Sequence, residues 1–344
     1  MWLRLAGGLG RLTLAVVIVG MTAWGAFALF YSDLANAGLR SALTGLFSLA
    51  GLVAAGAQLF GWRRGKAGLA FLVLFGGLLI WWSGIEASND RDWQPEVARL
   101  AHAEIEGKRI TVRNIRNFDY RSETDFTPAW YDKTFELDKL ESVDLVAVYW
   151  MGPAIAHTFL SFGFAGGDHL AVSIETRKEK NEGYSTLKGF FKQYELYYVV
   201  ADERDVVRVR TNYRKDPPED VYIYRVRGNL ENGRRVFLEY MHRINGLKER
   251  PEFYNTLADN CTTGIWMNTR VNPGHLPLSW EILASGYVPA YLHERGLLDN
   301  GMSFTQLQQR SHVNERARAA DQAADFSRRI REGLPFQARA PGGD

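Results

Sequence analysis

Three long segments near the start of the 344-residue chain carry no charged side chain. They cover residues 12–32, 41–62 and 67–85. A membrane-spanning helix needs about 20 apolar residues at 1.5 Å of rise each, so each segment is long enough to cross a bilayer. The first apolar run is longer than that of a signal peptide, and it is expected to stay attached. Residues 1–85 are therefore predicted to form an anchor of three transmembrane helices.

Basic residues flank these segments unevenly. Arg4 and Arg11 precede the first segment, and Arg63, Arg64 and Lys66 lie between the second and the third. Because cytoplasmic loops are enriched in Lys and Arg, this pattern places the N-terminus in the cytoplasm and everything after the third segment outside. We expect a protein of the bacterial inner (cytoplasmic) membrane with a large periplasmic domain.

The remaining sequence predicts a linker at 86–108 and a folded domain at 109–312. Alternating or β-branched apolar runs, separated by turn residues, are typical of strands. Helices gathered late in the chain favour an α+β domain with a mainly antiparallel sheet. The predicted strands are 109–115, 143–150, 155–164, 169–176, 194–201, 205–211 and 221–226.

The predicted helices follow the strands. Apolar residues at helical spacing indicate a helix at 234–247, and a second helix is expected from about 260 to 270. The final segment, 313–344, is predicted to hold a polar helix at 314–332 and then a disordered tail.

The composition argues against several classes of partner. The net charge is only +2, and the basic excess lies in the anchor, so the outer domain lacks the cationic surplus that nucleic-acid binding needs. The seven histidines are scattered and the single cysteine has no partner, so no metal site is predicted. The sequence has no nucleotide-binding loop and no zinc-protease motif, and no cofactor is expected.

Cys261, in the stretch TLADNCTTGIW, is the only cysteine. Such a thiol outside the cytoplasm is a small buried hydrophobe, a cross-link between chains, or a nucleophile. Asp259 and Asn260 are good N-caps, so Cys261 is expected at a helix start, where the helix dipole favours the thiolate. The N–H groups of Cys261 and the next two residues would hold an oxyanion. Asn260, Thr262 and Thr263 are therefore predicted to contact the substrate.

His157, in the stretch AIAHTFLSF, is the candidate base for this thiol. Its orienting partner is open between Glu175 and His169. A four-residue AGGD loop would set His157 opposite Thr176, whereas a one-residue bulge beside the glycines would bring Glu175 opposite His157. In either register His169 stays at the turn, about 20 Å from His157. We therefore expect Glu175 to orient the imidazole.

Five stretches of the sequence resemble a known family. The order of His, a polar group on the next strand and Asn-Cys opening a helix is similar to the circularly permuted NlpC-like cysteine enzymes, which include lecithin:retinol acyltransferase. The closer resemblance is to the Lnb N-terminal periplasmic domain family, over roughly residues 110–270. The stretches are DYRSETDFTPAWYD (119–132), GPAIAHTFLSFGF (152–164), VSIETRKEKNEGYS (172–185), YVVADERDVVRVRTNYR (198–214) and FYNTLADNCTT (253–263).

This resemblance implies a permuted papain/NlpC-like fold and a lipoprotein N-acyltransferase-like activity. Cys261 and His157 match the family's Cys-His pair, and Glu175 matches a motif position. The three spans ahead of the domain depart from the namesake, in which membrane segments follow the domain, so the substrate stays open.

The function expected from these observations is that of a membrane-anchored periplasmic thiol acyltransferase. It would move an acyl chain from a phospholipid or lipoprotein ester to an amine acceptor through a Cys261 thioester. Membrane phospholipid, and with it lipoprotein, is the expected partner. A cysteine amidase or peptidase of the cell envelope and a non-enzymatic scaffold with an inert Cys261 remain alternatives. The residues expected to line an acyl channel are Trp150, Phe159, Phe162 and Phe164.

Overall fold

The computed structural model describes residues 2–34 and 36–335, and these divide into two compact units. The first unit runs to Ser88 and also includes Tyr184–Glu195. The second unit comprises Asn89–Gly183 and the chain from Leu196 onward. Most of the predicted disordered tail lies outside the described residues.

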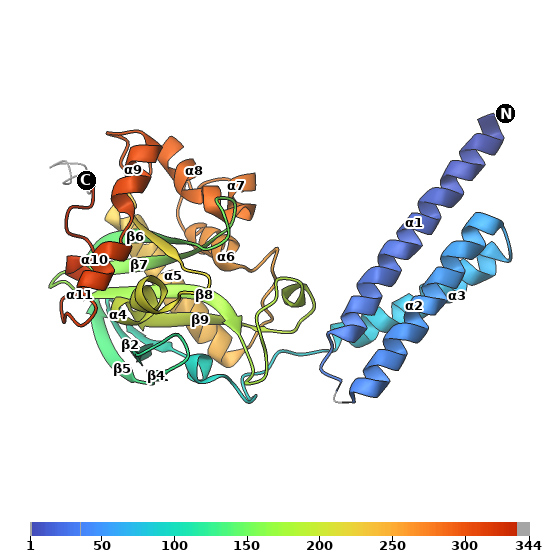
Figure 1. Ribbon diagram of the computed structural model, residues 1–344, viewed down its shortest axis with the longest axis horizontal. Coiled ribbons are helices and arrows are strands. Elements are labelled where there is room, and N and C mark those ends of the chain that lie inside the picture. Colours follow the sequence, from blue (N-terminus) through green and yellow to red (C-terminus); the bar gives the residue numbers. More distant parts are fainter. Residues whose placement is uncertain (1, 35, 336–344) are drawn as a thin grey trace. The chain divides into compact units, whose positions relative to one another are not determined.

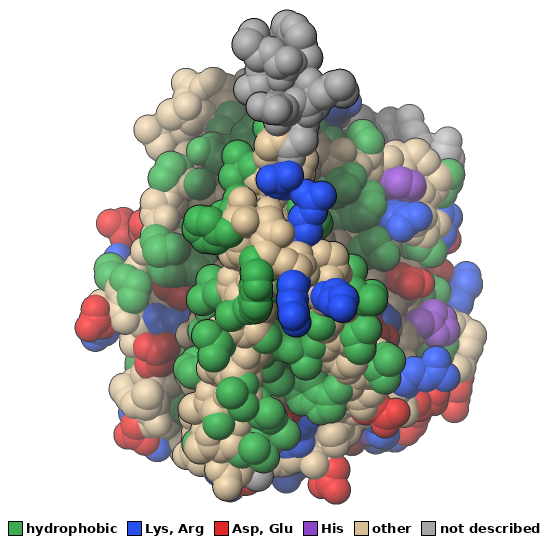
Figure 2. Space-filling view, turned by 90° about the vertical axis from the view of Figure 1, so that its right-hand side faces the viewer, with side chains coloured by type: hydrophobic (Ala, Val, Ile, Leu, Met, Phe, Trp, Pro, Cys, Tyr) green, Lys and Arg blue, Asp and Glu red, His purple; other side chains and the backbone are tan. Residues whose placement is uncertain are grey.

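Three apolar helices form most of the first unit. They are α1 (Trp2–Phe30), α2 (Ala37–Phe60) and α3 (Arg64–Ser83), and each contains a stretch long and apolar enough to cross a membrane. Figure 2 shows hydrophobic side chains spread over the surface of these helices. The expectation of three apolar, span-length helices at the start of the chain is confirmed.

The segment Tyr184–Glu195 packs with these helices although it lies far away in the sequence. The ring of Phe191 lies 5.7 Å from that of Phe27 and 6.3 Å from that of Trp82, measured between ring centroids. Lys192 Nζ donates to the carbonyl oxygens of Trp82 and Ile85, both at 2.9 Å. Aromatic contacts therefore hold the segment Tyr184–Glu195 against the helices. The Lys192 ammonium group also provides hydrogen bonds for carbonyl oxygens at the end of α3.

An eight-stranded mixed sheet forms the centre of the second unit (Figure 1). Its order is β1-β2-β9-β8-β7-β6-β10, with β5 beside β2. Antiparallel pairs predominate, and β2 pairs with β9 in parallel. The α+β prediction is confirmed at this level. The strands are β1 (His102–Glu106), β2 (Arg109–Arg116), β5 (Trp130–Glu136), β6 (Leu140–Tyr149), β7 (Ala156–Phe164), β8 (His169–Arg177), β9 (Glu195–Asp202) and β10 (Asp220–Arg225), with the separate pair β3 (Asp119–Tyr120) and β4 (Phe126–Thr127).

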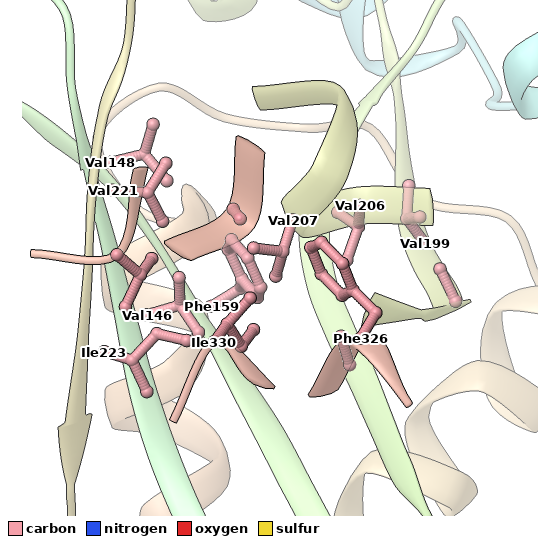
Figure 3. Packing of buried hydrophobic residues seen from close by; sticks show 14 of the residues in the cluster. Val146, Val148, Phe159, Val199, Val206, Val207, Val221, Ile223, Phe326 and Ile330 are labelled. Atoms are coloured by element: carbon pink, nitrogen blue, oxygen red, sulfur yellow. The ribbon is translucent and has the colours of Figure 1, made fainter. Parts of the chain in front are cut away.

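Helices cover both faces of this sheet. The helix α5 packs its aromatic residues on one face, where the ring centroid of Phe237 lies 5.2 Å from that of Phe162. Between the other face and the helices α4, α10 and α11 lies a core of Val, Ile and Phe side chains (Figure 3). The helices are α4 (Glu203–Arg208), α5 (Leu230–Glu249), α6 (Cys261–Thr269), α7 (Trp280–Leu283), α8 (Val288–Glu294), α9 (Phe304–Ser311), α10 (Asn314–Ala319) and α11 (Phe326–Arg329).

Five short turns complete the elements. They are the 3-10 turns at Pro95–Val97, Leu137–Lys139, Lys188–Phe190 and Ser285–Tyr287, and a π-helical turn at Val209–Tyr213.

The predicted strand at 205–211 is wrong, because this segment is α4 followed by the π-helical turn. Its valines are β-branched, which suggested a strand. The Asp202 side chain, however, accepts a hydrogen bond from Arg204 N at 2.9 Å and caps a helix start. Asp205 then forms a buried ion pair with Arg116 at 2.7 Å. Capping and burial outweigh the intrinsic preference of the valines.

Most of the predicted linker, from Asn89 onward, and the described part of the C-terminal segment also belong to the second unit. The strand β1 lies within 86–108 and pairs with β2 through Glu106↔Arg109. At the other end, Arg331 Nη2 contacts the buried carboxylates of Asp144 at 2.8 Å and Glu203 at 2.6 Å. Two short helices replace the single predicted helix at 314–332, and their apolar residues belong to the core of Figure 3.

Candidate active site

A short loop joins β7 to β8. Phe164 N–H donates to Asp168 O at 2.8 Å, so the loop has three residues rather than the four of the AGGD loop. Gly166 and Gly167 have φ values of 94° and 91°, which only glycine adopts readily. The tight turn is therefore set by the two glycines.

This loop length fixes which residues of β7 and β8 lie opposite each other. Leu160 pairs with Val172. When this register is continued three residues further along β7, His157 lies opposite Glu175 rather than Thr176. Opposed residues point to the same face of a sheet, so the two side chains can meet.

His157, Ser173 and Glu175 form a chain of contacts. His157 Nε2 lies 2.7 Å from Ser173 Oγ and 3.5 Å from Glu175 Oε1. Ser173 Oγ donates to Glu175 Oε1 at 2.9 Å. A hydroxyl that donates to the carboxylate accepts from the ring, so Nε2 carries a hydrogen and Nδ1 is left to exchange a proton.

Arg210 holds the other side of Glu175. Its Nη2 donates to Glu175 Oε1 at 3.0 Å, and its Nη1 lies 3.4 Å from Glu219 Oε2. Arg210 lies in the π-helical turn that follows α4, and single π-turns are frequent at functional sites. The structure thus adds Ser173 and Arg210 to the predicted residues.

His169 lies elsewhere. It pairs with Gly163 beside the turn, and its Nδ1 contacts Gly167 O at 3.0 Å. Of the two residues considered as partners of His157, only Glu175 is within contact distance.

Cys261 is the first residue of α6. Asn260 is the N-cap, and its Oδ1 accepts from the N–H groups of Thr262 and Thr263, both at 2.9 Å. Thr263 Oγ1 accepts in return from Asn260 N at 2.9 Å, which completes a capping box. The predicted helix start is confirmed.

The same cap already uses two of the backbone N–H groups that the oxyanion prediction invokes. The N–H groups of Thr262 and Thr263 were expected to hold an oxyanion, but both already donate to Asn260. The Thr262 hydroxyl lies 2.9 Å from that of Thr158 on β7. These side chains therefore position α6, and of the three N–H groups only that of Cys261 is not used by the cap.

The helix α6 lies against both strands of the hairpin. Thr262 contacts Thr158 on β7, and Gly264 lies so close to Ile174 of β8 that an added Cβ would come within 2.6 Å of its Cδ1. This packing brings the half-buried thiol of Cys261 into hydrogen-bond contact with His157.

The two groups shift each other's titration. Burial alone would raise the pKa of the Cys261 thiol, but the charge and hydrogen bond of His157 outweigh it and lower the pKa to about 7. Burial and the charge of Arg210 lower the pKa of His157, whereas Cys261 and Glu175 raise it, and the net shift is upward. A thiolate–imidazolium pair is therefore favoured near neutral pH.

Glu175 stays ionised beside this pair. Burial acts to raise its pKa, but the hydrogen bond to His157 and the charge of Arg210 hold the pKa well below the ordinary value. A carboxylate fixed in this way stabilises a protonated imidazole.

A cavity of about 900 Å³ begins beside Thr158 and Thr262. Cys261 and His157 are not among its lining residues, but Cys261 Sγ lies 3.6 Å from Oγ1 of Thr262, which is one of them. The apolar lining includes Leu145, Leu160, Ile265, Trp266, Ile282 and Leu292.

The residues expected to line an acyl channel lie elsewhere. Phe159 and Phe162 are fully buried in the core on opposite faces of the sheet. Phe164 packs against Phe237, and Trp150 lines a second cavity of about 430 Å³. Alternation along β7 explains the difference, because Leu160 faces the large cavity while its neighbour Phe159 faces away.

Some signals for the missed residues were present in the sequence. Ser173 is two positions before Glu175 and therefore on the same face of a strand. Arg210 had no such signal, because its segment was interpreted as a strand. No group of three or more potential metal ligands occurs among the described residues.

A protein-family model matches part of the chain. Residues 126–286 match the family model of the Lnb N-terminal periplasmic domain. The matched range contains His157, Ser173, Glu175, Arg210 and Cys261 and lies after the three apolar helices. No curated protein matches the chain significantly. No solved structure does so either.

Proposed function

Because residues 126–286 belong to the Lnb N-terminal periplasmic domain family, on a chain anchored by three apolar helices, we propose that this protein is a membrane-anchored thiol acyltransferase. It moves an acyl chain from a phospholipid or lipoprotein ester to an amine acceptor through a thioester on Cys261. The observation that carries this proposal is the Cys261–His157 pair, together with a largely apolar cavity that is lined by Thr262, the residue after Cys261.

The first half of the reaction is attack by the thiolate. Cys261 Sγ bonds to the ester carbonyl carbon, and the backbone N–H of Cys261 donates to the developing oxyanion at the positive end of α6. The carbon–oxygen bond of the ester then breaks. The imidazolium of His157 gives its Nδ1 proton to the leaving alkoxide, which departs as an alcohol.

The second half returns the enzyme to its starting state. An amine attacks the thioester carbonyl, and its proton passes to His157 Nδ1. The carbon–sulfur bond breaks, so the products are an amide and the Cys261 thiolate beside imidazolium. Ser173 and Glu175 hold the ring in one orientation through both steps.

The cavity supports an acyl group rather than a peptide as the transferred part. A volume of about 900 Å³ with Leu, Ile and Trp walls suits a flexible hydrocarbon chain. A cell-wall amidase would instead need a groove with polar partners for a peptide. The cavity also has polar and charged lining residues, so the preference for an acyl group rests on its apolar walls; they include Glu141, Arg225, Arg227, Asn229, Asn232, Asn272, His275 and Asp299.

The anchor supports a lipid donor. A site tethered to a bilayer meets phospholipid at high effective concentration. We place the protein in the bacterial inner membrane with its N-terminus cytoplasmic, from the basic residues at the span ends. A permuted papain/NlpC-like fold is part of the same proposal, since it accounts for a histidine strand that precedes the cysteine helix.

Mass spectrometry of the full chain after incubation with phospholipid vesicles tests this function. We expect Cys261 to gain the mass of an acyl group. Hydroxylamine should remove this added mass, and the Cys261→Ser and His157→Ala variants should lack it. An added amine should remove the acyl group from Cys261, and the corresponding amide should be detected as the product. Release as free fatty acid alone would favour a hydrolase. If Cys261 is not acylated and its thiol has an ordinary pKa, the result would favour the non-enzymatic scaffold.

A further inference from the structure

Every exposed large apolar side chain in the described part of the second unit falls in two short segments, 151–155 and 257–287. A protein surface normally carries such residues scattered singly. The six most exposed, called here the apolar rim, are Met151, Leu257, Met267, Leu278, Trp280 and Leu283.

These two segments are joined in space. Gly286 N–H donates to Ala154 O at 3.0 Å, and Ala156 N–H donates to Ser285 Oγ at 3.0 Å. Trp266 Nε1 on α6 donates to Leu276 O at 2.8 Å, which ties α6 to the chain that follows it. These hydrogen bonds hold the chain around Ala154 beside Ser285 and Gly286, and hold Trp266 of α6 beside Leu276.

The apolar rim lies on the chain segments that carry or adjoin the candidate active site. Met151 lies in the loop that leads into His157, and Leu257 lies in the turn that precedes Cys261. Met267 is on α6 itself, whose first residue is Cys261. The cavity is lined partly by Leu276 and Ile282, from the segment that carries Leu278, Trp280 and Leu283.

The exposed fractions are large for these residue types. Met151 exposes 65% of its surface and Trp280 exposes 60%. Charged side chains are few here: Asp259, Arg270 and Glu281 are the only ones in both segments. Such a surface can form few ion pairs with a charged partner. An apolar partner would bury it away from water, which is energetically favourable.

We propose that the apolar rim inserts into the phospholipid bilayer in which the chain is anchored. The bilayer is the apolar partner that the three spans keep within reach. Exposed Leu, Met and Trp side chains grouped together, with Trp at the headgroup level, are those by which proteins lie in a membrane interface. The acyl chains would then meet the protein at the margin of the cavity beside Cys261.

This proposal goes beyond the chemistry and can be tested without it. In full-length Cys261→Ser protein, Leu278→Cys or Leu283→Cys supplies a single thiol for an environment-sensitive fluorophore. Lys108→Cys, on the exposed β1–β2 turn, is the control. The labelled chains are placed in phosphatidylcholine–phosphatidylglycerol vesicles with and without lipids that carry a doxyl quencher on the acyl chain.

We expect the label at 278 and 283 to show blue-shifted emission that doxyl lipids quench, and the label at 108 to show neither effect. Equal, unquenched emission at all three positions would overturn the proposal. Blue-shifted emission that doxyl lipids leave unchanged, and that fades as the lipid-to-protein ratio rises, would overturn it in favour of a second copy of the chain. Because the tested protein lacks the thiol, neither result depends on acyl transfer.

Discussion

His157 reaches Glu175 through the hydroxyl of Ser173. The ring nitrogen Nε2 lies 2.7 Å from Ser173 Oγ, whereas its direct distance to Glu175 Oε1 is 3.5 Å. The carboxylate therefore acts on the imidazole mainly by way of a neutral group, which fixes the ring without taking its proton.

Replacing this hydroxyl tests its role. In Ser173→Ala, His157 loses its hydrogen-bond acceptor, so its pKa falls and the thiolate is less stabilised. We expect the midpoint for alkylation of Cys261 to rise by about one pH unit, which lowers the thiolate fraction roughly tenfold at pH 6. The measurement is the rate of iodoacetamide labelling against pH.

The matched control is Ser161→Ala. Ser161 also lies on this hairpin and also donates to a buried carboxylate, that of Glu203. Its loss should lower thermal stability but leave the labelling profile in place. A shift of equal size in both variants would mean that Ser173 acts only through stability.

The pH dependence of the wild-type thiol follows from its lowered pKa. A group whose pKa is depressed is charged above that value and loses its charge as the pH falls through it. We expect labelling of Cys261 to rise with a midpoint near pH 7. In His157→Ala, burial is opposed only by the hydrogen bonds of the Thr158 backbone and the Thr262 side chain, and the midpoint should rise toward the ordinary thiol value of about 8.5 or above it. An unchanged midpoint in this variant would contradict the pairing of the two residues.

The cavity makes a prediction about chain length. Leu292→Trp adds an indole to its wall. Thioester formation from long-chain phospholipid should fall, while transfer from a short-chain ester should persist. Both rates are measured by mass spectrometry of Cys261, with iodoacetamide labelling as the check that the thiol is intact. Equal loss for both chain lengths would place the acyl group outside this cavity.

Gly286 makes a prediction about packing. A Cβ at this position would lie 2.1 Å from Pro153 O and 2.8 Å from the carbonyl carbon of Ala154. Both atoms belong to the backbone of the loop before His157, so Gly286→Ala must displace it. We expect about 1–3 kcal/mol of destabilisation and a loss of thiol activation.

The control for this change is Gly246→Ala on α5, where no atom lies within 4 Å of the added Cβ. Alanine in an exposed helix position should stabilise by about 0.5–1 kcal/mol. Thermal unfolding of the full chain in detergent, followed by circular dichroism, compares the two. Similar melting temperatures would contradict the crowding at Gly286.

The C-terminal region makes the last prediction. Arg331→Met leaves the buried carboxylates of Asp144 and Glu203 without their shared partner. Removing one member of such a cluster costs about 3–5 kcal/mol, so the melting temperature should fall sharply. The control is Arg329→Met, which breaks an exposed pair with Asp325 and should have little effect.

The parts of the site that follow short-range rules could be predicted from the sequence. Alternation along β7 and β8, with glycines between them, made Glu175 a partner of His157. Asn260 before Cys261 predicted the helix start. These rules depend only on neighbours within the chain or across one hairpin.

The parts that depend on distant contacts could not be predicted. Arg210 reaches Glu175 because its segment is helical, and that helix is held by the ion pair between Asp205 and Arg116. The use of the N–H groups at the start of α6 could not be predicted either, since one asparagine oxygen accepts from both Thr262 and Thr263. Sequence spacing does not reveal whether a backbone N–H group already donates a hydrogen bond to another residue.

The three-residue loop after Phe164 makes the site vulnerable to a change in length alone. If the turn kept its three residues, one extra codon between Ala165 and Gly167 would slide β8 by one position against β7. Ile174 would then stand opposite His157, and the Glu175 carboxylate would point to the other face of the sheet. Such an insertion alters no residue that contacts the thiol, yet it would disconnect the base from its carboxylate. Selection on this loop should therefore act on its number of residues as strongly as on their identity.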